Sequence, residues 1–187
     1  QVFIDRCRLR GQAAFLSFRM NDAHHKEFTD PKPGDKPGSS IGMSVTRWYA
    51  EHPEWRIKPG SIRGADLVQN WAVPEVRVQK FALIRELCEN YDIDGLELDF
   101  LRTYSYFREN ETTVEQRCEI MTAFVAEVRA LLDHTTREGK RRFLCARVPC
   151  HLPALDLLGL DLKALVAAGL DMVNASDHYF TTQQHDL

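Results

Sequence analysis

Short runs of apolar residues recur along the chain, separated by polar segments and turn residues. Runs of about four to eight apolar positions are typical of strands buried in a parallel sheet. The runs that predict strands lie at 13–20, 66–72, 95–100, 143–148 and 170–175. The pattern therefore predicts about five strands.

Between these runs, apolar residues recur with the spacing of an amphipathic helix. The helices that this spacing predicts are 75–90, a second that begins after Thr112 or Thr113 and runs to about 133, and 161–168. Pro74 suits the first position of a helix. Thr112 or Thr113 can cap the second helix, with Glu115 or Gln116 as partner. Strands that alternate with helices favour a parallel sheet with right-handed crossovers.

Two architectures of the α/β class accommodate this order, an open doubly wound sheet and a (β/α)8 barrel of the TIM-barrel type. Polar residues follow several of the strands, and barrels build their active sites at these carboxyl ends, so we favour the barrel. A full barrel needs about 250 residues. The 187-residue chain is therefore expected to be one catalytic-type domain, 1–187, that forms an incomplete barrel of about five strands. An open sheet does not have to close, so the length of this chain would be no difficulty for that architecture.

The segment 22–64 is rich in Pro and Gly and predicts a long loop on the substrate side of the barrel. Loops of this length inside a domain are usually functional or disordered. Aromatic residues are rare in disordered linkers, and this loop contains Trp48 and Trp55, so we expect it to be ordered. Aromatic rings offer flat apolar faces to sugars. Trp48 and Trp71 are therefore candidate sugar contacts, although ordinary packing explains them equally well.

Composition excludes several classes of function. Hydrophobic residues make up 44% of the chain, charged residues 27%, and the net charge is −3, so neither nucleic acid nor an anionic membrane is an expected partner. No apolar run approaches the roughly 18 residues of a membrane span. Residues 1–6 lack the basic start and apolar stretch of a signal peptide, and a cytoplasmic and an exported location both stay open. The five cysteines lack a CxxC pair and are expected to be buried, reduced thiols.

The run 95–100 carries two acidic residues inside an apolar strand. Because side chains alternate between the faces of a strand, Leu96 and Leu98 share one face and Glu97 and Asp99 share the other. Burying two carboxylates side by side is costly unless they are paired or used. We therefore expect them to point into the barrel and to be catalytic.

Polar side chains also follow the first strand and three later strands. In a barrel these positions lie at the mouth, where substrates bind. The residues that we expect to contact substrate are Arg19, Asn21, His24, His25, Arg102, Arg147, His151 and His178, with Asp22 as a further catalytic carboxylate. Asn21 and Asp22 could instead close the strand through turn hydrogen bonds. Arg19 or Arg147 could instead form an ion-paired core with the carboxylates of 95–100.

The segment 94–99, Asp-Gly-Leu-Glu-Leu-Asp, resembles the fourth-strand motif of several glycoside hydrolase barrels. It partly matches the chitinase pattern D-G-[apolar]-D-[apolar]-D-x-E. The final Glu of that pattern falls on Leu101, so the chitinase acid is absent. Leu98-Asp99 also resembles the α-amylase-like strand, which ends in a nucleophilic Asp. The resemblance implies a catalytic carboxylate at Asp99 and argues against chitinase activity.

A wider resemblance, over roughly 13–178, is to bacterial barrel proteins called glycosyl-hydrolase-like or family-10-like. The segments that carry it are 18–24, 74–77, 91–102 and 146–149. It implies a TIM-barrel fold and the glycoside hydrolase class. It does not specify a substrate, because one fold hosts many chemistries.

Three functions are compatible with these residues. The first is a glycoside hydrolase that uses Asp99 as nucleophile or acid and Glu97 as its assistant. The second is a glycan-binding barrel without hydrolysis, and the third is a metal-dependent hydrolase or lyase with Asp22, His24 and His178. Established metal-ligand spacings and the nucleotide-binding and serine-hydrolase motifs are missing from the sequence. We therefore expect a carbohydrate partner, no cofactor and no bound metal.

Overall fold

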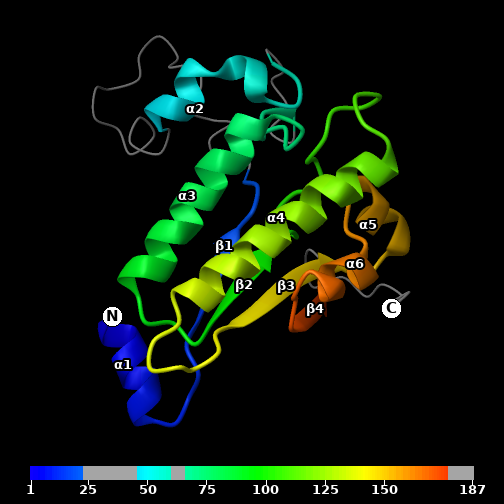
Figure 1. Cartoon of the computed structure of the whole chain (residues 1–187). Helices are drawn as coiled ribbons and strands as arrows, with labels where there is room; N and C mark the ends of the chain where they lie inside the picture. Colours follow the sequence, from blue (N-terminus) through cyan, green and yellow to red (C-terminus); the bar gives the residue numbers. More distant parts are fainter. Residues whose placement is uncertain (23–45, 60–65, 177–187) are drawn as a thin grey trace.

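A parallel sheet of four strands forms the centre of the structure, a computed structural model that describes residues 1–22, 46–59 and 66–176. The strands are β1 (Phe15–Arg19), β2 (Gly95–Asp99), β3 (Phe143–Pro149) and β4 (Met172–Ser176). They lie in the order of the sequence, and each neighbouring pair is parallel (Figure 1). The predicted α/β class with a parallel sheet is confirmed.

Helices connect the strands and cover one face of the sheet. The helices of the described chain are α1 (Val2–Leu9), α2 (Arg47–Glu51), α3 (Pro74–Asn90), α4 (Val114–His134), α5 (Leu152–Leu158) and α6 (Leu162–Ala167), with a short 3-10 helix at Pro53–Trp55. In Figure 1, α4 passes in front of the strands, with α3 on one side of it and α5 and α6 on the other. The α2 helix lies near the start of α3, at the carboxyl end of the strands, and α1 lies at the opposite end.

The face of the sheet beneath α3 and α4 is apolar. Leu96 and Leu98 of β2 are register partners of Leu144 and Ala146 of β3, and all four side chains are fully buried. They share one hydrophobic core with Phe124 of α4. Because removing apolar area from water is the main favourable term in folding, this face holds the helices on the sheet.

The predicted strands 13–20, 95–100, 143–148 and 170–175 are confirmed to within a few residues. The two long helices are confirmed as well. Pro74 occupies the first turn of α3. At the start of α4, the Thr113 hydroxyl accepts the N–H of Gln116 at 3.3 Å, and the Gln116 side chain accepts the N–H of Thr113 at 2.9 Å. This capping box fixes where α4 begins.

The segment 66–72 forms no strand, so the expectation of about five strands is wrong for the described residues. In place of a strand ladder, this segment forms one isolated antiparallel bridge, between Gln69 and Arg56. The N–H of Trp71 donates to the carbonyl of Tyr106 at 2.7 Å. These backbone groups pair with loops that are distant in sequence, and a local apolar pattern cannot reveal such partners.

The expected loop at 22–64 is described only over 46–59, which forms α2 and the 3-10 helix. Neither was predicted. The Thr46 hydroxyl caps α2 by accepting the N–H of Tyr49 at 3.2 Å. A helix of about one turn is too short to leave a periodic pattern in the sequence. The rest of the loop lies outside the described residues.

None of the helices in the described ranges is long and apolar enough to cross a membrane. Cys88, Cys145 and Cys150 are buried free thiols, and Cys7 and Cys118 are half-buried free thiols. The expected burial therefore holds for three of the five cysteines, and the other two are only partly buried.

Two buried arginines join the elements at the amino end of the sheet. Arg129 of α4 donates from Nη1 to the carbonyl of Arg142 at 2.9 Å and to the carboxylate of Asp171 at 3.2 Å. The same carboxylate accepts the N–H of Leu144 at 2.8 Å. Arg142 donates to the carbonyl of Cys88, near the end of α3, at 2.8 Å. Because removing one partner leaves a buried charge uncompensated, this network fixes α3, α4 and β3 relative to the start of β4.

Gly159 ends α5 in the left-handed conformation, with φ +70°, and a Cβ there would lie 2.5 Å from the Arg117 backbone. Gly139 has a similar φ of +69° but open space around it. We expect Gly159→Ala to lower the free energy of unfolding by about 2–4 kcal/mol, from strain plus overpacking, and Gly139→Ala by about 1–2 kcal/mol, from strain alone. Urea unfolding of both variants measures this difference. Equal losses would show that the contact with Arg117 is unimportant.

Candidate functional site

The face of the sheet opposite α3 and α4 carries polar side chains in two rows. Parallel pairing aligns Ser17, Glu97 and Cys145 in the first row. One step toward the carboxyl end, it aligns Arg19, Asp99, Arg147 and Asn174 in the second row. We call this surface the polar face. It brings together the two carboxylates and two of the arginines that the sequence analysis selected.

Glu97 is half-buried, and the hydrogen bonds to its carboxylate come from neutral groups. The Ser17 hydroxyl donates to Oε1 at 2.7 Å, and the Asn174 amide donates to Oε2 at 3.4 Å. The Cys145 thiol lies 3.9 Å from Oε2. Burial, together with the charge of Glu97, raises the pKa of Cys145, so this thiol stays protonated and is a hydrogen-bond donor rather than a nucleophile.

Asp99 is almost completely buried and lies beside a guanidinium group. Its Oδ1 accepts the N–H of Leu101 at 3.0 Å, and its Oδ2 lies 3.6 Å from Nη1 of Arg147. Arg147 also donates from Nε to the Ser176 hydroxyl at 3.1 Å. The positive charge of Arg147 offsets the negative charge of Asp99. Glu97 and Asp99 therefore have separate sets of partners and different electrostatic surroundings.

Asp22 lies at the end of β1 and pairs with Arg19, with 2.9 Å between Oδ2 and Nη1. The Arg19 side chain is 51% exposed, so it is accessible from solvent. Asp22 also has a favourable electrostatic interaction with Lys80 of α3. The candidate carboxylate after β1 therefore lies between two cations.

Lys80 is a residue that the sequence analysis missed. It lies on α3 between Val76 and Ile84, which are four residues away on either side and fully buried. Burial lowers the pKa of Lys80 to about 8, and the nearby Asp22 opposes this shift. A lysine at helical spacing between two core positions is the signal that could have identified it.

Two expected substrate contacts, Asn21 and Trp71, are fully buried. The Asn21 amide donates to the carbonyls of Gln69 at 2.9 Å and Ser105 at 3.0 Å, which joins three loops. Trp71 packs edge-on against Phe124, with ring centroids 5.0 Å apart. The structure gives both side chains a packing role and leaves neither on an open surface.

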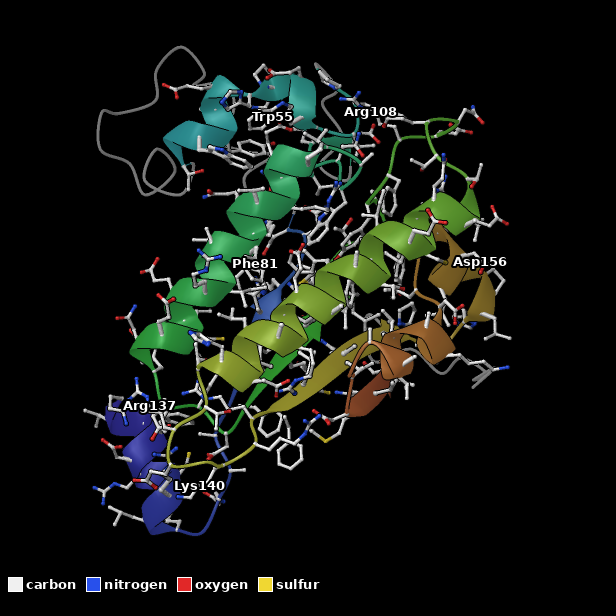
Figure 2. The ribbon with its side chains drawn as sticks, in the orientation of Figure 1. Trp55, Phe81, Arg108, Arg137, Lys140 and Asp156 are labelled. Carbon is white, nitrogen blue, oxygen red and sulfur yellow. The ribbon has the colours of Figure 1, made fainter. Side chains whose placement is uncertain are left out.

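Trp48 belongs to an aromatic cluster at the carboxyl end of the sheet. Its ring centroid lies 5.1 Å from that of Trp55, and His52 stacks on Trp55 at 3.6 Å. Arg108, in the loop after β2, donates to the carbonyl of Arg56 and holds this cluster in place. Figure 2 labels Trp55 and Arg108 at this end of the molecule.

The remaining candidates are only partly described. Arg102 lies in the turn after β2 and is half-buried. His151 precedes α5 and is also half-buried. His24, His25 and His178 lie outside the described residues. Within the described ranges, no group of three or more His, Cys, Asp or Glu residues could hold a metal ion.

No protein-family model matches this sequence, and a comparison with curated proteins finds no significant match. The functional interpretation therefore depends on the geometry of the polar face and on the motifs in the sequence.

We expect Lys80→Met to stabilise the protein at pH 7. The pKa of Lys80 is about 8 in the folded state, against 10.5 for an ordinary lysine, so the unfolded chain binds the proton more tightly. The full shift corresponds to about 3 kcal/mol. Because part of the side chain contacts solvent, we expect a gain nearer 1 kcal/mol, or about 2–4 °C in Tm.

The gain in stability of Lys80→Met should be constant below about pH 8 and should shrink as the pH rises toward 10.5. Over that window the buried amine of the folded wild-type protein loses its proton while the unfolded chain keeps it, so the wild-type protein becomes relatively more stable. Thermal unfolding of both proteins from pH 6 to pH 10 measures it. Lys163→Met, at an exposed site on α6, is the matched control. A gain that does not change with pH would exclude the titration of Lys80 as its cause.

Proposed function

We propose that this protein is a glycoside hydrolase and that its active site is the polar face at the carboxyl end of the sheet. The observation that carries the proposal is the pair Glu97 and Asp99, which occupy alternate positions on one face of β2. Glycoside hydrolases generally use two carboxyl groups on either side of the scissile bond. Same-face neighbours have Cα atoms about 6.6 Å apart, which is compatible with the roughly 5–9.5 Å between such carboxyl groups.

We further propose that β1 to β4 are consecutive strands of a (β/α)8 barrel. In a barrel, strands follow one another in sequence order and helices cover the outside only. A doubly wound sheet reverses its strand order and carries helices on both faces. The order β1-β2-β3-β4 and the shared side of α3 and α4 support the barrel, as does the resemblance of 91–102. The polar face would then line the interior, with its second row at the mouth.

The surroundings of the two carboxylates support different roles. Asp99 has a guanidinium and a backbone N–H beside it, and these contacts hold its carboxylate in a fixed orientation, as suits a nucleophile. Glu97 is more exposed and contacts neutral donors, as suits a group that gives and takes a proton. We therefore assign Asp99 as the nucleophile and Glu97 as the acid and base.

The polar face also suits recognition of a sugar. Each sugar hydroxyl can both donate and accept a hydrogen bond. The second row carries the donors of Arg19, Arg147 and Asn174 together with the Asp99 acceptor, in the order Arg19, Asp99, Arg147 and Asn174. This arrangement provides both types of partner at spacings of neighbouring strands, about 4.8 Å.

A glycan-binding protein without hydrolysis is the second candidate. The contact between Arg147 and Asp99 favours it, because an ion pair of this kind also serves a purely structural purpose. The two candidates differ in whether a glycosidic bond is broken.

We expect Glu97→Gln and Asp99→Asn each to lower kcat/KM on a cleaved glycan by about 100-fold or more. Release of reducing ends from a panel of polysaccharides identifies the substrate and measures the loss. An aryl glycoside with an activated leaving group separates the roles. It needs no proton for departure, so Glu97→Gln should regain glycosidic cleavage and Asp99→Asn should not.

Glu86→Gln, on the exposed side of α3, is the matched control and should leave kcat/KM unchanged. Circular dichroism and thermal unfolding establish that each variant is folded. Full turnover by folded Asp99→Asn would exclude the assignment. Glycan binding by the wild-type protein, with no release of reducing ends from any substrate bound, would favour the second candidate.

A further inference from the structure

Resting on the proposed function, we propose that the substrate is an acidic glycan and that Arg102 binds the carboxylate of a uronic acid residue. Arg102 lies in the turn that follows β2, three positions beyond Asp99. It is therefore at the carboxyl end of the strand that carries both candidate catalytic groups. The inference goes beyond the reaction type, because it names the chemical class of the substrate.

Arg102 lacks the partners that other shielded arginines of this chain have. Its Nε is withdrawn from solvent, and its guanidinium makes no hydrogen bond or ion pair with the described residues. By contrast, Arg108, Arg129 and Arg142 each donate to backbone carbonyls or carboxylates. A shielded donor without an acceptor destabilises a fold. An anionic ligand would supply the acceptor that the protein leaves out.

The neighbouring arginines keep donors available on the same end of the sheet. Arg19 uses one nitrogen, Nη1, for Asp22, and Arg147 uses Nε for Ser176 and Nη1 for Asp99. Their Nη2 groups have no acceptor among the described residues. A ligand held by Arg102 would therefore meet further donors along the second row.

The chemistry of arginine further favours a carboxylate ligand. The planar guanidinium matches the two oxygens of a carboxylate, which it can bind in a bidentate manner.

Isothermal titration calorimetry with three matched trisaccharides tests the inference. The probes are trigalacturonate, its carboxyl-reduced neutral form, and a galactose trimer that carries sulfate esters. We expect trigalacturonate to bind about tenfold or more tightly than the neutral form, with an affinity that falls as the ionic strength rises. Equal affinity for the charged and neutral probes would overturn the inference. Tighter binding of the sulfated probe would overturn the choice of a carboxylate.

Arg102→Gln should abolish the preference for trigalacturonate over the neutral probe. Arg10→Gln, an exposed change of the same charge at the opposite end of the sheet, should keep the preference. Because Arg102 has no hydrogen-bond or ion-pair partner among the described residues, its replacement should not lower Tm, whereas the loss of a structural arginine would. A preference that survives in Arg102→Gln, or a loss that is equal in both variants, would overturn the assignment.

The two proposals fail in different ways. Binding of trigalacturonate that depends on Arg102, without cleavage of any glycan, would contradict the hydrolase and support the acidic ligand. Cleavage of neutral glycans with no preference for uronate would contradict the acidic ligand and support the hydrolase. Arg102→Lys provides a second variant, which should retain part of the preference because it keeps the charge without the bidentate geometry.

Discussion

Parallel pairing of β1 to β4 in one register is the constraint on which the rest of the structure depends. Side chains alternate along each strand, and the pairing aligns alternate positions of four strands across the sheet. Leu96 and Leu98 thus join an apolar surface that holds α3 and α4, and Glu97 and Asp99 join polar rows on the other side. A slip of one residue in β2 would bury both carboxylates under the helices. The same register therefore specifies both the core and the candidate site.

Much of this arrangement could be predicted from the sequence, because it depends on local periods. The strands, α3, α4 and the shared face of Glu97 and Asp99 follow from alternation and helical spacing. The capping box at Thr113 follows from a pattern of four residues. What was missed depends on partners distant in the sequence. Asn21 contacts Gln69 and Ser105, across 48 and 84 residues, and no local rule indicates that its amide is already occupied.

The candidate site also shows why single residues are harder to assign than elements. A tryptophan before a helix is compatible with sugar stacking and with core packing, and only the tertiary structure distinguishes them. Trp71 is fully buried against Phe124, whereas Trp48 lies in a cluster with His52 and Trp55. Lys80 shows the opposite case. It follows the spacing of core residues on α3, yet its amine remains titratable next to the end of β1.

The buried network of Arg129, Arg142 and Asp171 lies at the amino end of the sheet, and the polar rows extend to its carboxyl end. The groups that secure the helices to the strands are thus separate in space from those proposed to meet a ligand. Such a separation makes a scaffold evolvable. Loops and side chains at one end can diversify toward new substrates, while anchoring contacts at the other end preserve a foldable chain.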